Sequence, residues 1–151
     1  MTHGTILLAA TLVLAPGLAL ATAGPSTEET VWSLESDYFT SLYRAEYDRV
    51  LALGHPRFLG WPDGKPKPLD HEGSAAFMRK IVAGPTPCRI EIERQGIEVQ
   101  GSVALTQYVL RARCTGSDGK ETTRSSRICH TWVKAGAGAE WKLLGGMSRD
   151  L

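Results

Sequence analysis

The sequence has 151 residues, which is enough for one domain with one hydrophobic core. It contains 17 Lys and Arg against 16 Asp and Glu, so the formal net charge is +1. Because a near-neutral chain without a basic patch is poorly suited to bind nucleic acid, we exclude that class of partner.

The first 23 residues have the pattern of a secretory signal peptide. Residues 6–15 are apolar, Pro16 and Gly17 interrupt them, and small residues up to Ala23 offer cleavage sites. A membrane anchor is the alternative, but the apolar run is shorter than the roughly 20 residues that span a bilayer. We therefore expect cleavage after Ala23, a mature domain over residues 24–151, and a secreted or periplasmic protein with no membrane attachment.

The start of the mature chain predicts two helices. Ser26 and Glu29 form a capping box, and apolar side chains then recur every three or four residues. These apolar side chains are Val31, Leu34, Tyr38, Leu42 and Ala45. Glu35 lies off this stripe, which we expect to face the core. A second, short helical turn over Val50 to Leu53 ends at Gly54.

Residues 57–70, "RFLGWPDGKPKPLD", contain three prolines and two glycines, which predicts neither an ordinary helix nor a central strand. Trp61 in this segment has two interpretations, as a plug in the core or as the rim of a pocket. Asp63 lies in a Pro-Asp-Gly turn. Asp70 then caps a third helix, in which four residues share one face: His71, Ala75, Met78 and Val82.

Four strand-like runs make up the rest of the chain, separated by glycine-containing segments that can form hairpin turns. The runs are "CRIEIERQGIEVQ", "SVALTQYVLRARC", "TTRSSRICHTWVK" and "EWKLLGGMSRDL". This order predicts an antiparallel meander with the helices on one face, which is an α+β domain.

The three cysteines leave two interpretations open. A hairpin around Gly101 places Cys88 opposite Cys114, so this pair could form a disulfide and Cys129 would be left over. An irregularity at Gln95 would shift the register, and three reduced thiols are the alternative. The spacing excludes the usual zinc patterns, and we expect no metal.

The order of elements resembles the nuclear transport factor 2-like superfamily, and within it the SnoaL-like domains of unknown function. The similarity extends from about Val31 to Met147, and its most specific part is the closing hairpin of "HTWVK" and "EWKLL". The resemblance implies a cone-shaped, curved antiparallel sheet wrapped by about three helices, with an apolar cavity at the open end. It also implies homodimers formed through the sheet and places Trp61 and Asp63 at the mouth of the cavity.

The superfamily includes isomerases, cyclases and dehydratases, which need a base in an apolar cavity and a donor to the developing oxyanion. His130 shares a strand face with Trp132, so it is the candidate base, with Tyr38 or Tyr108 as the donor. A buried histidine is more often a structural residue. The candidate ligand contacts are Trp61, Trp132, Tyr108 and Asp63. No motif indicates a cofactor, a nucleophile or a phosphate loop.

Three functional hypotheses follow. The leading one is a secreted domain that binds a small apolar or amphipathic molecule, as a homodimer. The second is a cofactor-independent isomerase, lyase or cyclase that uses His130 as its base. The third is a non-catalytic module for dimerisation or partner binding. The sequence alone does not choose among them, because fold does not determine function.

Overall fold

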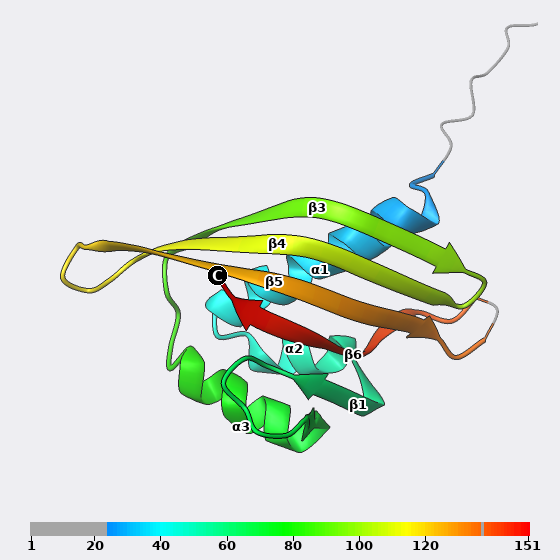
Figure 1. The fold of residues 1–151 in the computed structure, drawn as a ribbon, viewed down its shortest axis with the longest axis horizontal. Helices are drawn as coiled ribbons and strands as arrows, with labels where there is room; N and C mark the ends of the chain where they lie inside the picture. The colour runs from blue at the N-terminus through cyan, green and yellow to red at the C-terminus, as the bar shows by residue number, and fades with distance from the viewer. Residues whose placement is uncertain (1–23, 137) are drawn as a thin grey trace, which may run out of the picture.

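The computed structural model describes residues 24–136 and 138–151 (Figure 1). The predicted signal peptide lies outside the described residues. In chain order the elements are α1 (Thr27–Tyr43), α2 (Tyr47–Leu53), β1 (Gly54–Trp61), β2 (Leu69–Asp70), α3 (His71–Ile81), β3 (Cys88–Gln100), β4 (Val103–Thr115), β5 (Glu121–Lys134) and β6 (Trp141–Asp150). In the described part of the chain, no helix is long and apolar enough to cross a membrane.

The strands form one curved sheet in the order β2-β1-β6-β5-β4-β3. Strands β3 to β6 pair antiparallel in sequence order, which confirms the predicted meander and the α+β class. Strand β1 pairs parallel with β6, so the whole sheet is mixed. Helices α1 and α2 lie across one face of the sheet, and α3 lies beside β1 (Figure 1).

The prediction that no central strand passes through residues 57–70 was wrong, because β1 continues to Trp61 between β2 and β6. Two features of the chain allow this pairing. Pro56 precedes the part of β1 that pairs with β6 in continuous register, which begins at Leu59. Opposite that part, a Cβ atom on Gly145 would lie 2.0 Å from the carbonyl oxygen of Leu59, so only glycine permits the approach of the two backbones.

Helix α1 begins as predicted, with Ser26 Oγ accepting a hydrogen bond of 3.2 Å from the backbone N–H of Glu29. Its buried face differs from the predicted stripe. The buried residues of α1 are Val31, Trp32, Glu35, Phe39, Ser41 and Leu42. Ala45 lies beyond the helix at a positive φ of 58°. The expectation that Glu35 lies off the core-facing stripe was wrong, because the buried face is rotated toward Trp32 and Phe39 and includes Glu35.

The core consists of two adjoining clusters. The first contains Trp32, Phe39, Leu42, Val50, Met78, Val82, Tyr108, Leu110 and Ile128. The second contains Val31, Ala104, Trp132, Trp141 and Leu143. Both clusters draw on helix residues and on the inward-facing residues of β4 and β5, so the core lies between the helices and the covered face of the sheet.

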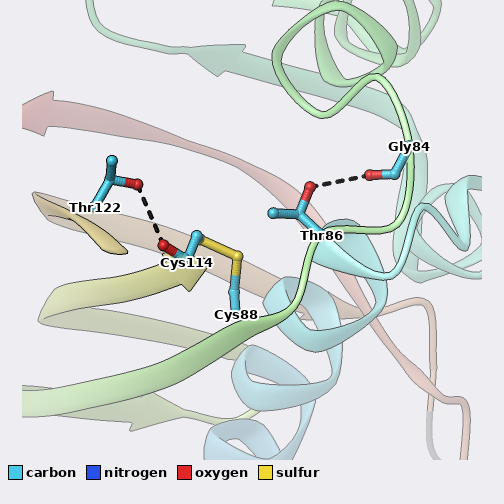
Figure 2. The surroundings of a disulfide bond; sticks show 5 residues. All are labelled: Gly84, Thr86, Cys88, Cys114 and Thr122. Atoms are coloured by element: carbon cyan, nitrogen blue, oxygen red, sulfur yellow. Dashed lines mark hydrogen bonds between the residues drawn. A yellow bond between two sulfur atoms is a disulfide. The ribbon is translucent and has the colours of Figure 1, made fainter. Parts of the chain in front are cut away.

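Cys88 and Cys114 lie opposite each other on β3 and β4, and their sulfur atoms form a disulfide (Figure 2). The register shifts by one residue between Arg94 and Gly96, at the expected irregularity. The disulfide joins the ends of two strands where the chain arrives from α3. Cys129 is the free cysteine among the described residues.

Replacing both Cys88 and Cys114 by Ser is expected to lower the free energy of unfolding by about 2–4 kcal/mol, because the cross-link restricts the unfolded chain. Urea unfolding of the oxidised proteins measures this change. Cys129→Ser is the matched control and is expected to change stability by less than about 1 kcal/mol. Equal stability of the double variant and the control would contradict the structural role of the disulfide.

Candidate functional site

The carboxylate of Glu35 is fully buried and lies at the centre of a hydrogen-bond network. Its Oε1 atom accepts from Thr106 Oγ1 at 2.6 Å and from Trp132 Nε1 at 2.7 Å. Its Oε2 atom accepts from the Tyr108 hydroxyl at 2.6 Å and lies 2.8 Å from His130 Nδ1. Each oxygen therefore has two partners, which is close to the full acceptor capacity of an ionised carboxylate.

The sheet register brings these four partners together. Thr106 and Tyr108 are two apart on β4, and His130 and Trp132 are two apart on β5, so all four point to the covered face. Thr106 lies directly opposite His130 in the antiparallel pairing. Glu35 reaches this group from α1, the helix that packs over the centre of the sheet.

Glu35 is ionised at neutral pH. Burial raises the pKa of its carboxyl group. The attraction of His130 and the hydrogen bonds from His130, Thr106 and Tyr108 together lower this pKa by more than burial raises it, so the net pKa lies below its usual value. A buried charge is tolerated only when such partners replace its hydration. The network therefore holds a permanent negative charge within the core.

Glu35 fixes the orientation of His130. Because an ionised carboxylate can only accept hydrogen bonds, His130 Nδ1 carries the proton of this contact. The imidazole stacks on Phe39 at 6.1 Å between ring centroids, and Tyr38 meets it edge-on at 5.6 Å. A Cβ atom on Gly146 would lie 2.4 Å from His130 Cδ2, so glycine leaves the space that the ring occupies.

His130 lines a pocket, and its second ring nitrogen, Nε2, is not fully buried. None of the hydrogen bonds among the described residues involves Nε2, and every fully buried side-chain nitrogen or oxygen in that part of the chain has a partner. His130 lines a cavity of about 120 Å³. The other wall residues are Tyr38, Phe39, Leu42, Phe58, Gly60, Trp61, Pro62, Ser74, Phe77, Met78, Ile81, Ile128, Gly146, Met147 and Ser148.

Trp61 lies at the rim of this pocket. Its side chain is 44% exposed, and its indole Nε1 donates a 2.7 Å hydrogen bond to the backbone oxygen of Lys65. That bond closes the loop after β1 and holds the ring beside the pocket. The exposure of Trp61 contradicts the interpretation of this residue as a plug in the core.

Tyr38 lines the same pocket, so the structure brings together three predicted site residues: His130, Tyr38 and Trp61. The Tyr38 hydroxyl donates to Met78 Sδ at 3.6 Å, and a thioether is a weak acceptor. Burial raises the pKa of Tyr38, and the charge of Glu35 raises it further. The hydroxyl therefore keeps its proton and can donate a hydrogen bond to an acceptor stronger than the Met78 sulfur.

The other three predicted ligand contacts do not line this pocket. Trp132 is fully buried and Tyr108 is 2% exposed, and both donate to Glu35 instead. The pKa of Tyr108 is raised by burial and by the Glu35 charge. Asp63 is exposed, and its Oδ2 accepts a 3.2 Å hydrogen bond from the backbone N–H of Asp150, which ties the turn to β6. These residues support the site rather than forming its surface.

No cation site accompanies the pocket in the described residues, since no three His, Cys, Asp or Glu side chains of residues 24–136 and 138–151 lie together as metal ligands would.

Solved structures with the same architecture cover most of the chain. An association domain of the calcium/calmodulin dependent protein kinase II type from Xanthomonas campestris superposes with a TM-score of 0.70 over 88% of this chain and 93% of its own, at 16% identity. A nuclear transport factor 2-like protein from Cytophaga hutchinsonii gives 0.65 over 84% and 100%, at 12% identity. This chain has the nuclear transport factor 2-like fold.

A ketosteroid isomerase-like protein from Erwinia carotovora atroseptica has the same fold, with a TM-score of 0.67 over 82% of this chain and 95% of its own, at 14% identity. No model of a known protein family matches the sequence, and no curated protein matches it either. At these identities the nuclear transport factor 2-like likeness establishes the fold, and the function must be argued from the site.

Glu35, the residue on which the site depends, was not among the predicted site residues. A signal was present, because Trp32, Glu35, Phe39 and Leu42 recur at helical spacing and form an alternative stripe. An acidic residue within an apolar stripe is a candidate for a buried functional group, since an unpartnered carboxylate would not be placed there.

Glu35→Gln is expected to lower the free energy of unfolding at pH 7 by about 2–4 kcal/mol, because an amide cannot accept from all four donors. Glu28→Gln is the matched control, since Glu28 is an exposed residue of the same helix and its loss costs less than about 0.5 kcal/mol. Chemical denaturation across a pH series measures both.

The difference between the wild type and Glu35→Gln depends on pH in a defined direction. Because the folded-state pKa of Glu35 is lowered, its stabilisation is present above the unfolded pKa of about 4.3 and is lost as the pH falls through the folded-state value. The two stabilities therefore converge in acid. A constant difference from pH 7 to pH 2 would show that Glu35 is not a buried carboxylate held in its charged form.

Proposed function

We propose that this domain binds a small molecule in the pocket beneath Trp61, with a polar group of that molecule on His130. The proposal rests on the different surroundings of the two ring nitrogens of His130. Nδ1 is held by the buried carboxylate of Glu35, and Nε2 is left for a ligand in an otherwise largely apolar pocket. A concave apolar site with few convergent polar groups is the usual form of a ligand pocket.

Proton transfer at the same nitrogen is a second candidate function, favoured by the charge of Glu35. A carboxylate behind a histidine stabilises the imidazolium that forms when Nε2 accepts a proton. Tyr38 lines the pocket with a protonated hydroxyl, which can donate a hydrogen bond to a developing oxyanion. The ketosteroid isomerase-like neighbour supports this class of reaction by its fold alone.

The reaction that these groups would perform is the shift of a proton next to a carbonyl group. Nε2 removes a proton from carbon, the electron pair of the C–H bond forms an enolate, and Tyr38 donates a hydrogen bond to the enolate oxygen. The proton on Nε2 then returns to carbon. Every proton and electron pair is conserved, so the step requires no cofactor.

Binding is tested by titrating the protein with a library of one- to three-ring fragments and following methyl resonances by NMR. Binding in the pocket is expected to shift the resonances of Met78 and Ile128, which line it, and to leave Leu110 of the first core cluster unchanged. If fragments of every size and charge leave Met78 and Ile128 unshifted, the pocket is not a binding site.

Proton transfer is tested by the exchange of deuterium into the α-position of a cyclic ketone in D₂O. The wild type is expected to accelerate exchange by about 10²-fold or more over His130→Gln and Glu35→Gln. His55→Gln is the control, because His55 lies on β1 outside the pocket lining and its Nδ1 accepts from the Arg57 backbone. Equal exchange with the wild type and His130→Gln would leave binding as the function.

We also propose that the domain is exported and forms a homodimer through the outer face of its sheet. The disulfide suits an oxidising compartment, and large apolar side chains are exposed on the strands: Leu59, Val103, Leu105 and Met147. The intact mass of the protein purified from its native host is expected to show the loss of residues 1–23. Analytical sedimentation of the purified protein is expected to give twice the mass of one chain. An uncleaved or monomeric protein would contradict the respective proposal.

A further inference from the structure

The pocket has a definite size, charge and hydrogen-bonding polarity, and these three properties define a class of ligand. We infer that the pocket selects a neutral, single-ring molecule that donates one hydrogen bond to His130 Nε2, as a phenol does. This inference rests on the proposed binding function and narrows it to one chemical class.

The size of the cavity limits the ligand to about one ring. Its volume is about 120 Å³, whereas pockets for drug-sized ligands hold roughly 300–1,000 Å³. An apolar protein cavity of about 150 Å³ is known to admit benzene. Residues from α1, α3 and β1 close the pocket on several sides, and two of its walls, Phe39 and Met78, are buried core residues. A fused two-ring molecule would exceed this volume and extend past the rim at Trp61.

The walls of the cavity favour an uncharged ligand. Its lining includes no Lys, Arg, Asp or Glu among the described residues. The nearby cation of Lys65 lies over the face of Phe77 at 4.8 Å instead of lining the pocket. The charge of Glu35 lies behind His130 and is already satisfied by its four partners. An anionic ligand would lose its hydration without gaining a counter-ion.

The hydrogen-bond polarity follows from the tautomer of His130. Since Nδ1 donates to Glu35, Nε2 of the neutral imidazole has a free lone pair and acts as an acceptor. A ligand hydroxyl or N–H group can donate to that lone pair. A flat ring also suits the aromatic lining of Phe39, Phe58 and Phe77, against which it can pack edge to face.

Four probe molecules separate these properties: phenol, benzene, benzoate and 2-naphthol. Benzene removes the donor and 2-naphthol adds a second ring, whereas benzoate, which is ionised at neutral pH, adds a charge and also removes the donor, so its matched comparison is benzene. Calorimetry gives the affinities, and the Met78 and Ile128 methyl resonances report the site. Phenol is expected to bind about tenfold more tightly than benzene, because the net contribution of one hydrogen bond corresponds to about that change in affinity. It is also expected to bind more tightly than benzoate or 2-naphthol.

Variants isolate the hydrogen bond from the packing. His130→Phe keeps a ring in place and removes the acceptor, so phenol is expected to lose its advantage over benzene while benzene still binds. His55→Phe is the control and keeps the advantage, because His55 does not line the pocket. An unchanged preference for phenol in His130→Phe would overturn the assigned acceptor, and wild-type protein alone tests size and charge if this variant fails to fold.

The failures of the two proposals differ. Equal or tighter binding of 2-naphthol or benzoate at the Met78 and Ile128 methyl groups would overturn the ligand class and leave the pocket as a binding site. If none of the four probes shifts these methyl groups, and the wider fragment library also fails to do so, the proposed binding function itself is overturned.

Discussion

The buried negative charge of Glu35 is the constraint on which the site and much of the core depend. A carboxylate in an apolar interior must be matched by donors, and here four of them come from two adjacent strands. Helix α1 must therefore pack at one height and one rotation against β4 and β5. The same charge that constrains the packing also fixes the tautomer of His130.

The pocket is a consequence of this arrangement. Nδ1 of His130 is held by Glu35, and the same residue lines the pocket between α1, α3 and β1. Two glycines of β6 make that geometry accessible, since Gly145 admits β1 and Gly146 leaves room for the His130 ring. Sequence features far apart in the chain thus converge on the side chain of His130.

Local rules predicted much of the fold. The caps at Ser26 and Asp70 and the meander follow from short-range patterns. Cys88 lies opposite Cys114 as predicted, but only because the shift between Arg94 and Gly96 offsets a register at the turn in which Val99 pairs with Ala104. Strand β1 could not be predicted in this way, because its parallel pairing depends on a distant glycine, Gly145, rather than on its own proline-rich sequence.

The site was predicted only in part for a similar reason. Strand parity identified the face of His130, and the resemblance placed Trp61 at the mouth of a cavity. Trp132 and Tyr108 lie on the same face as His130, but their polar atoms turn to Glu35 instead of to the pocket. The alternation of side chains along a strand predicts which face of the sheet a residue lies on. What the side chain contacts on that face depends on the residues of the helix packed against it.

The most direct test of this account is the tautomer of His130, read from long-range ¹H–¹⁵N correlations of the imidazole in the neutral protein. The account predicts that Nδ1 carries the proton and that Nε2 gives the resonance of an unprotonated nitrogen, with the Nδ1 proton shifted downfield by its bond to the Glu35 carboxylate. Protonation of Nε2 in the neutral ring would contradict it, because Nδ1 could then not donate to Glu35 and Nε2 could not accept from a ligand.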